Sequence, residues 1–140
     1  MLQRIQTVWL LIASALGFAT LTNSISFFSG NKLVDNISKF VPLNARENIF
    51  IFILTVAIAV ATLVVIFLYK DRKMQLKITL GIFAVAILNI VLYYLQTKNY
   101  IEGKMDLTSL VVFAIPVFLL LAARGIWKDE QLIKSVDRLR

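Results

Sequence analysis

The sequence predicts an all-α integral membrane protein, a bundle of four antiparallel transmembrane helices with up-down-up-down topology. Three observations predict this fold class. The mean hydropathy of +0.82 is too high for a chain whose whole surface faces water. The apolar residues form four blocks separated by charged segments. The Lys and Arg residues gather on one side of these blocks, as in polytopic membrane proteins. We expect residues 1–140 to form a single domain.

The four apolar blocks are the predicted spans. A helix needs about 20 apolar residues to cross the hydrocarbon of a bilayer. Four stretches meet this length and contain no acidic residue: residues 8–28, 49–69, 78–95 and 107–127. The second stretch is rich in β-branched residues, but it is far longer than a typical strand of about 5 or 6 residues. All four blocks are therefore expected to be helical.

The flanks of the spans contain helix-start signals. Asn44, followed three residues later by Glu47, has the form of a capping box before the second span. Asp106 is expected to cap the fourth span. The first block could instead be a cleaved signal peptide, because residues 13–15 are small. Its apolar run continues well past that point, which favours a retained span.

The positive charges predict the orientation. Ten of the fifteen Lys and Arg residues lie at the N-terminus, in residues 70–77 and from residue 124 onward. The other five lie in the loops around residues 32–46 and 98–104. Positive residues near span ends are retained in the cytoplasm, so both termini and the 70–77 connection are expected to be cytoplasmic.

The first outer loop has an apolar pattern of its own. Leu33, Ile37, Phe40 and Val41 stand at helical spacing before Pro42, which indicates a short helix lying in the membrane interface. A loop that caps the bundle and a lid over a ligand site are alternatives that the residues leave open.

The composition excludes much catalytic chemistry. The chain has no Cys and no His, and Arg124 is the one charged residue within the four spans. Thiol, imidazole and the usual zinc or haem chemistry therefore lack their residues. We expect a protein that is not an enzyme, has no cofactor or metal, and has no evident small-molecule substrate. Because its cations flank apolar spans, we do not expect it to bind nucleic acid.

Polar residues within the spans are the next candidates for function. Asn89 lies deep in the third span, where an amide needs a partner. We expect an intramembrane polar contact, an interhelical hydrogen bond contributing about 0.6 kcal/mol. With the Pro116 kink and the polar outer part of the first span, Asn89 could instead line the path of a small transporter or channel component.

The cytoplasmic tail, residues 128–140, continues the helical pattern of the fourth span. Leu132, Val136 and Leu139 share one face, and Glu130 stands four residues before Lys134, at the spacing of a helical ion pair. A purely basic tail would suit lipid headgroups, whereas mixed charge favours a protein partner. A solvated helix end that only fixes orientation stays an open alternative.

Three segments carry a resemblance to a known family. MLQRIQTVWLLIA, YKDRKMQLKI and RGIWKDEQLIKSVDRLR resemble the domain of unknown function 4293 family, small four-span inner-membrane proteins of Bacteroidota. The resemblance implies a multi-pass inner-membrane protein and brings no activity with it. The recognisable residues all belong to the predicted cytoplasmic side.

These observations predict a non-enzymatic accessory or scaffold subunit of a larger membrane protein complex, in contact with membrane lipids and other integral membrane proteins. Its spans and its tail would bind the partner. The predicted docking residues are Gln3, Arg4, Gln6, Arg72, Lys128, Asp129, Glu130, Lys134, Asp137, Arg138 and Arg140.

Overall fold

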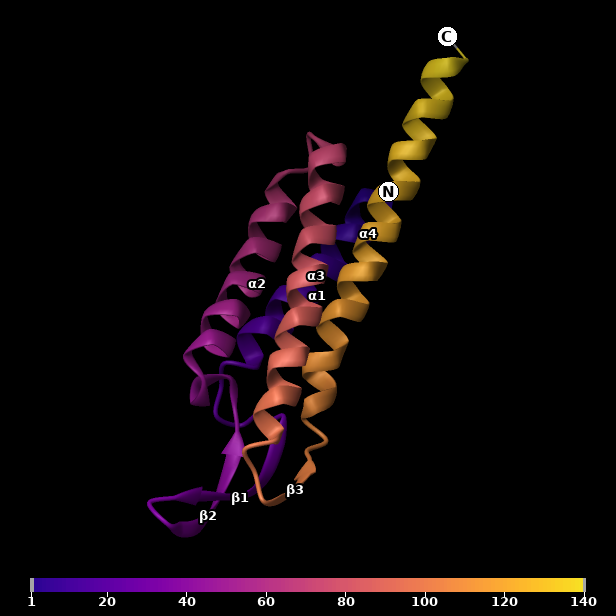
Figure 1. Cartoon of the computed structure of the whole chain (residues 1–140). Helices are drawn as coiled ribbons and strands as arrows, with labels where there is room; N and C mark the ends of the chain where they lie inside the picture. Colours follow the sequence, from indigo (N-terminus) through magenta and orange to yellow (C-terminus); the bar gives the residue numbers. More distant parts are fainter. Residues whose placement is uncertain (1, 140) are drawn as a thin grey trace.

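The computed structural model describes residues 2–139, with side chains from residue 5 onward. Four α-helices and a small sheet make up the described chain (Figure 1). In order, the elements are α1 Leu2–Ala19, β1 Phe28–Val34, β2 Ile37–Leu43, the 3-10 helix η1 Ala45–Glu47, α2 Ile49–Phe67, α3 Arg72–Thr97, β3 Glu102–Met105 and α4 Ser109–Arg138. Each of the four apolar blocks contains a helix, so the mostly helical class is confirmed, but the first block is helical only as far as Ala19 and the small sheet was not predicted.

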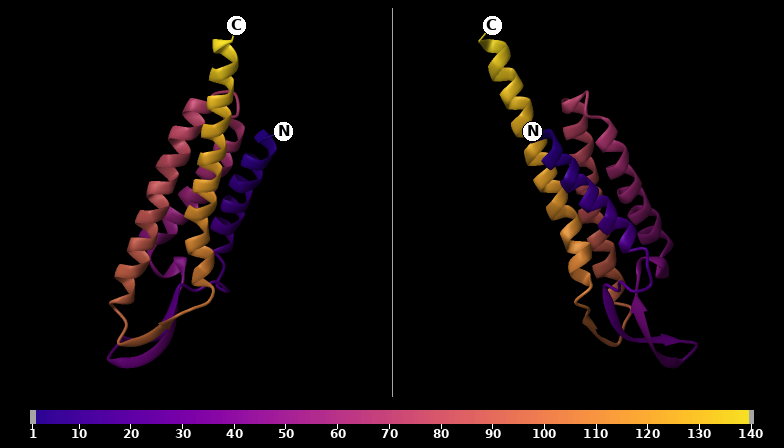
Figure 2. Two further views of the ribbon diagram at one scale, coloured as in Figure 1. Left: turned by 90° about the vertical axis from the view of Figure 1, so that its right-hand side faces the viewer. Right: turned by 180° about the vertical axis from the view of Figure 1, so that it is seen from behind.

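The helices form a closed ring of contacts. α1 and α3 each pack against both α2 and α4 (Figure 2). Leu10, Ile58, Ile82 and Leu119, one from each helix, are buried in a shared apolar core. The described ends of the chain lie at the same end of the bundle as the α2–α3 connection, and the sheet lies at the opposite end of the helices (Figure 1). We call the first the charged end (residues 2–7, 68–76 and 124–139) and the second the sheet end (residues 20–48 and 98–108).

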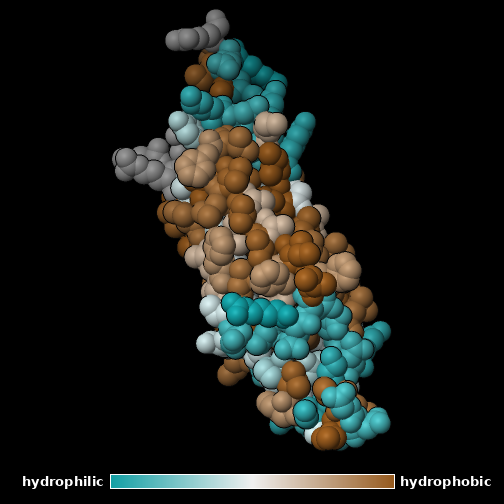
Figure 3. Space-filling model, turned by 90° about the vertical axis from the view of Figure 1, so that its left-hand side faces the viewer, coloured by the Kyte–Doolittle hydropathy of each residue, from teal (hydrophilic) through white to brown (hydrophobic). Residues whose placement is uncertain are grey.

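The helices carry a membrane-like surface. α2, α3 and α4 are each long and apolar enough to cross a bilayer, while the apolar part of α1, Ile5–Ala19, is shorter. Large apolar side chains such as Val64 and Leu110 are exposed on them. Figure 3 shows a hydrophobic belt over the helices between two more hydrophilic ends. Such an exposed belt indicates a membrane protein, because water would make it costly.

α1 differs from the predicted first span, residues 8–28. It begins at Leu2 and ends at Ala19, so the second part of that block is not helical. The hydroxyls of Thr20 and Thr22 each donate to a carbonyl three residues earlier, at 2.7 Å. Thr, Asn and Ser side chains compete in this way for backbone groups, and here they end the helix.

The expected interfacial helix in the first outer loop is wrong, because this segment forms a β-hairpin. Asp35 and Asn36 have φ values of 53° and 61°, which suit the two-residue turn of a hairpin, and Asn and Asp tolerate this conformation best after Gly. β1 pairs with β2 on one side and with β3 on the other, both antiparallel. Leu33 thus lies on β1 and Ile37, Phe40 and Val41 lie on β2, so their helical spacing does not reflect a helix.

The predicted caps are also misplaced. Asn44 precedes η1 and makes no side-chain cap, whereas Asn48 accepts a hydrogen bond from the Phe50 amide at 2.9 Å and caps α2. Thr108, not Asp106, is the residue before α4. The signals therefore marked a helix start correctly but placed it a few residues too early.

The fourth helix extends beyond its predicted span, as expected. α4 is continuous from Ser109 to Arg138 and runs through Pro116 without interruption. Its last part projects past the other helices (Figure 2), and residues 131–139 are all exposed.

Candidate functional site

A buried polar cluster ties three helices together at the charged end. The Asp129 side chain of α4 is only 4% exposed and accepts a hydrogen bond from Nε2 of Gln6 in α1 at 2.5 Å. Nη1 of Arg72, at the start of α3, lies 3.8 Å from Oδ2 of Asp129. A Cβ atom on Gly125 would lie 2.7 Å from Cγ of Gln6, so the glycine makes room for this side chain. The cluster thus joins segments at the two ends of the sequence.

Three predicted docking residues therefore contact one another. Gln6 and Asp129 are almost completely buried, and the Arg72 side chain is 22% exposed. A buried carboxylate is tolerated only when charged or hydrogen-bonding groups surround it, so this cluster fixes the relative position of α1, α3 and α4. Sequence reasoning assigned these residues to a partner surface, and the structure places them between helices of the same chain.

Gln75 reinforces the same end and was missed from the sequence. Its side chain is 6% exposed, and Nε2 donates to the carbonyl oxygen of Val65 in α2 at 3.1 Å. Val65 lies in the last turn of α2, and its carbonyl also accepts from the Leu68 amide at 3.1 Å, so Gln75 adds a second hydrogen bond where α2 ends. A signal existed: Asp71 caps α3 through the Met74 amide, which places Gln75 in the first turn beside the end of α2.

Five of the remaining predicted docking residues lie on the C-terminal part of α4. Lys128, Asp137 and Arg138 are exposed. Glu130 and Lys134 form the predicted ion pair, with Nζ and Oε1 2.9 Å apart. The side chains of Gln3, Arg4 and Arg140 lie outside the described residues.

The last part of α4, residues 131–139, projects past the other helices (Figure 2) and is called its free part here. An apolar stripe runs along it. Leu132, Ile133, Val136 and Leu139 have exposed fractions of 54%, 45%, 61% and 88%. At about 100° per residue Ile133 lies on the face of the fully buried Ala122 and Ile126, whereas Leu132 and Leu139 lie more than about 90° away from Ile126. The stripe is therefore turned away from the face that α4 packs against its own chain, and all four of its side chains are exposed.

Asn89 forms the polar contact expected within the spans. Its Nδ2 donates to Oγ1 of Thr55 at 3.0 Å, and that hydroxyl donates to the carbonyl of Ile51 at 2.7 Å. The bond links α3 to α2, which confirms the predicted interhelical hydrogen bond. Oδ1 of Asn89 is buried and has no partner among the residues that the structure describes.

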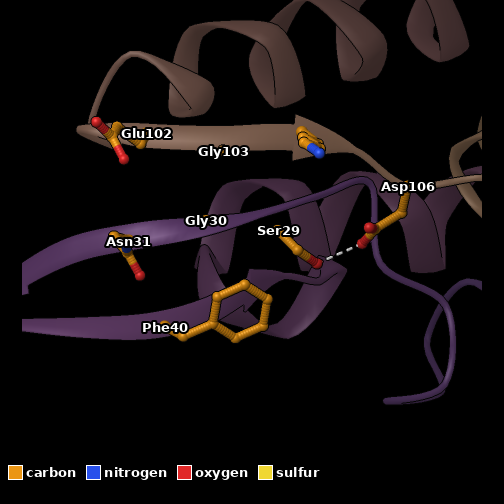
Figure 4. A pocket seen from close by; sticks show the side chains of 8 residues that line it. Ser29, Gly30, Asn31, Phe40, Glu102, Gly103 and Asp106 are labelled. Atoms are coloured by element: carbon orange, nitrogen blue, oxygen red, sulfur yellow. Dashed lines mark hydrogen bonds between the residues drawn. The ribbon is translucent and has the colours of Figure 1, made fainter.

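At the sheet end, the acidic residue Asp106 accepts hydrogen bonds from two side chains. The Asp106 carboxylate accepts hydrogen bonds from the hydroxyls of Ser26 and Ser29, and the Thr108 hydroxyl donates to the Ser26 carbonyl at 2.6 Å. Figure 4 shows Ser29 directed at Asp106 beside a hollow of about 460 Å³. The Asp106 carboxylate is thus hydrogen-bonded to hydroxyls of its own chain.

Tyr100 closes the sheet end against the helices. Its ring packs edge-on against Phe28 with centroids 5.3 Å apart, and Nζ of Lys32 lies 6.0 Å from the ring centroid. Burial, with the charge of Glu47 as the smaller cause, raises the pKa of Tyr100 above its ordinary value of 10.0. The phenol therefore stays neutral at physiological pH and offers no base.

The profile of a family described as a domain of unknown function (DUF4293) matches residues 2–139, nearly the whole chain. The chain belongs to this family. The resemblance carried by the N-terminal, middle and C-terminal segments is therefore confirmed. No curated protein and no solved structure matches the chain.

The DUF4293 match includes both the helices and the two ends. It spans Gln6, Arg72 and Asp129 as well as the exposed stripe of α4 and the strands. The buried cluster and the projecting end of α4 are thus parts of the matched domain and not additions outside it.

Proposed function

We propose that this DUF4293 member is a non-enzymatic accessory or scaffold subunit of a membrane protein complex. In this proposal α1 to α4 cross the bacterial inner membrane as an antiparallel four-span bundle. The charged end and both termini then lie in the cytoplasm, where positive residues are retained. The free part of α4 binds a cytoplasmic helix of another membrane subunit.

The exposed stripe at the end of α4 carries this proposal. Leu132, Val136 and Leu139 are spaced by four and then three residues, the repeat of a helix seam that receives one partner helix. With Leu132 and Leu139 at d, Val136 takes position a, where a β-branched residue favours a two-stranded pairing. Apolar side chains exposed in water on an ordered helix are otherwise unfavourable.

The charged residues of this segment support a helical partner. Glu130, Lys134, Asp137 and Arg138 occupy the b, c and f positions of the same repeat, which face away from the seam. The mixed charge therefore keeps the helix soluble and leaves the seam apolar. The single polar residue flanking the seam within residues 131–139 is Ser135, at position g.

A single-cysteine crosslinking experiment tests the docking surface. The natural chain has no cysteine, so one introduced thiol reports on one position. Val136→Cys, labelled with a short photoreactive maleimide in native membranes, should yield one crosslinked membrane protein, identified by mass spectrometry. The matched control is Gln131→Cys, which is exposed on the opposite side of the same helix and should yield little product.

Two outcomes would count against the proposal. Equal crosslinking from both positions would show that the seam is not the contact surface. Recovery of the full chain only as a lone monomer, in mild detergent and from membranes of its native host, would show that it has no stable partner.

Thiol accessibility tests the orientation separately. Ser135→Cys on α4 and Ser38→Cys on β2 are both exposed positions at opposite ends of the molecule. In intact cells a membrane-impermeant maleimide should label the second and not the first. The reverse pattern would invert the topology, and labelling of both would contradict the four-span arrangement.

A small transporter or channel component is the second candidate. It is favoured by the buried, unpartnered Oδ1 of Asn89, an acceptor that a passing cation or water could use. Flux through liposomes that contain the purified chain tests this role. Loss of flux in Asn89→Leu would support it, and identical flux with and without the protein would dismiss it.

A further inference from the structure

A hollow of about 420 Å³ lies at the charged end between α1, α2 and α3. It has one polar and one apolar wall. The polar wall contains Gln6, Thr7, Tyr69, Arg72 and Gln75, and the apolar wall contains Ile66 and Phe67 from the last turn of α2. Such a pairing of a cation with neighbouring apolar surface suits an amphiphilic anion.

Arg72 has hydrogen-bonding capacity to spare. A guanidinium carries five N–H donors. Its ion pair with Asp129 measures 3.8 Å, which is beyond hydrogen-bond distance, and Oδ2 of Asp129 already accepts from Gln6. The Arg72 side chain is 22% exposed and lines the hollow, whereas Asp129 does not. The guanidinium is therefore held in place by Asp129 and can offer donors to a ligand in the hollow.

The position of the hollow indicates which kind of anion could reach it. Phe67 and Tyr69 are 77% and 60% exposed, where α2 meets its connection to α3. Lys70 and Lys73 are exposed beside them. An aromatic rim with cations next to the end of an apolar helix is the arrangement found at the depth of lipid headgroups.

We propose that this hollow binds the phosphate of an anionic phospholipid. Arg72 donates two parallel hydrogen bonds to the phosphate, because its planar fork matches two phosphate oxygens. The Tyr69 hydroxyl donates a further bond, and Lys70 and Lys73 add attraction. Ile66 and Phe67 contact the glycerol and the first carbons of an acyl chain. This site rests on the placement of the helices across a membrane and is independent of a protein partner at α4.

Native mass spectrometry of the full chain in detergent tests the proposal. The purified protein is titrated with phosphatidylglycerol, with phosphatidylcholine and with inorganic phosphate. One phosphatidylglycerol should be retained preferentially. Arg72→Gln should weaken its binding by about tenfold, since a charge-assisted pair of hydrogen bonds is lost. Lys77→Gln, which removes an exposed cation of α3 outside the hollow, should change binding less than about twofold.

Two further variants keep the test decisive if Arg72→Gln destabilises the fold. Tyr69→Phe removes only an exposed hydroxyl and should weaken binding by about threefold. Arg72→Lys keeps the charge but loses the fork, and should bind more weakly than the natural chain. Equal binding of phosphatidylcholine, or equal effects of Arg72→Gln and Lys77→Gln, would overturn the proposal. Inorganic phosphate that displaces the lipid at equal concentration would identify a soluble phosphate as the ligand. Because the purified chain carries no partner, none of these outcomes bears on docking by α4.

Discussion

The two ends of the molecule each use one acidic residue in a different way. At the sheet end, Asp106 accepts from the hydroxyls of Ser26 and Ser29, beside strands that pair in the order β2-β1-β3. At the charged end, Asp129 is 4% exposed and holds Gln6 and Arg72. Beyond Asp129 the same helix leaves the bundle with its apolar stripe uncovered. The contacts of Asp106 therefore stay within the sheet end, whose hairpin also exposes Leu33, Ile37 and Phe40, whereas the contacts of Asp129 fix a helix that continues past the bundle.

This difference directs attention to the charged end as the functional one. At the sheet end, hydroxyl and backbone groups satisfy one another's hydrogen bonds, which costs little free energy. Burying a carboxylate costs more and is useful where the position of a helix must be fixed. Asp129 sets the point and angle at which α4 leaves the bundle, and the stripe begins three residues later at Leu132.

Removing Asp129 should have the largest effect of the variants considered. Asp129→Ala leaves the Gln6 amide and the Arg72 guanidinium facing each other without an acceptor. We expect a loss of about 2–3 kcal/mol in the free energy of unfolding, reduced from a fully buried pair because Arg72 is partly solvated. Reversible denaturation in detergent micelles, followed by circular dichroism, measures this loss.

Two controls sharpen this prediction. Asp129→Asn keeps an oxygen that can accept from Gln6 and should cost less than Asp129→Ala. Asp137→Ala removes an exposed carboxylate of the same helix and should change stability by less than about 0.5 kcal/mol. If Asp129→Ala and Asp137→Ala were alike, the cluster would not hold the charged end together.

The sequence revealed the helices better than it revealed either end. Long apolar blocks and the side on which cations gather follow from bilayer thickness and charge retention, which are local properties. Asp129 resembled any solvated residue of a charged tail, because its burial depends on Gln6, 123 positions away. The hairpin was missed because spacing alone could not weigh the turn preference of Asp35 and Asn36 against a helix.

At the sheet end, Gly30→Ala should have the second largest effect. A Cβ atom on Gly30 would lie 2.2 Å from the backbone oxygen of Glu102, so β3 must move away from β1. We expect a loss of about 1–3 kcal/mol, as for overpacked cores. Hydrogen exchange should show lost protection in residues 102–105 and unchanged protection at the charged end.

The matched control for this change is Gly81→Ala in α3. Apart from its chain neighbours and the adjacent backbone of α3, no atom of the described residues lies within 4 Å of the added Cβ, so this change should not lower stability. Lost protection at both ends in Gly30→Ala would show that the two ends are not independent, which would break the comparison.

Asp106→Ala should have a smaller effect than Gly30→Ala. It removes the acceptor of two serine hydroxyls, but these are only partly buried and can turn to water. We expect a loss of about 1 kcal/mol, below that of Asp129→Ala. Thermal unfolding of the two variants in the same detergent compares the two acidic residues directly. A larger loss for Asp106→Ala would reverse the ranking of the two ends.

The double variant Leu132→Ser and Val136→Ser should have the smallest effect on the isolated chain. Both side chains are more than half exposed, so the free energy of unfolding should change by less than about 0.5 kcal/mol. In native membranes the same variant should lose the crosslinked partner, because the seam has lost its apolar side chains. Stability and partner recovery thus separate the two roles of α4: Asp129 acts within the chain, and the stripe acts beyond it. A large loss of stability in the double variant would mean that the stripe packs on its own chain, and the two roles of α4 would then not be separate.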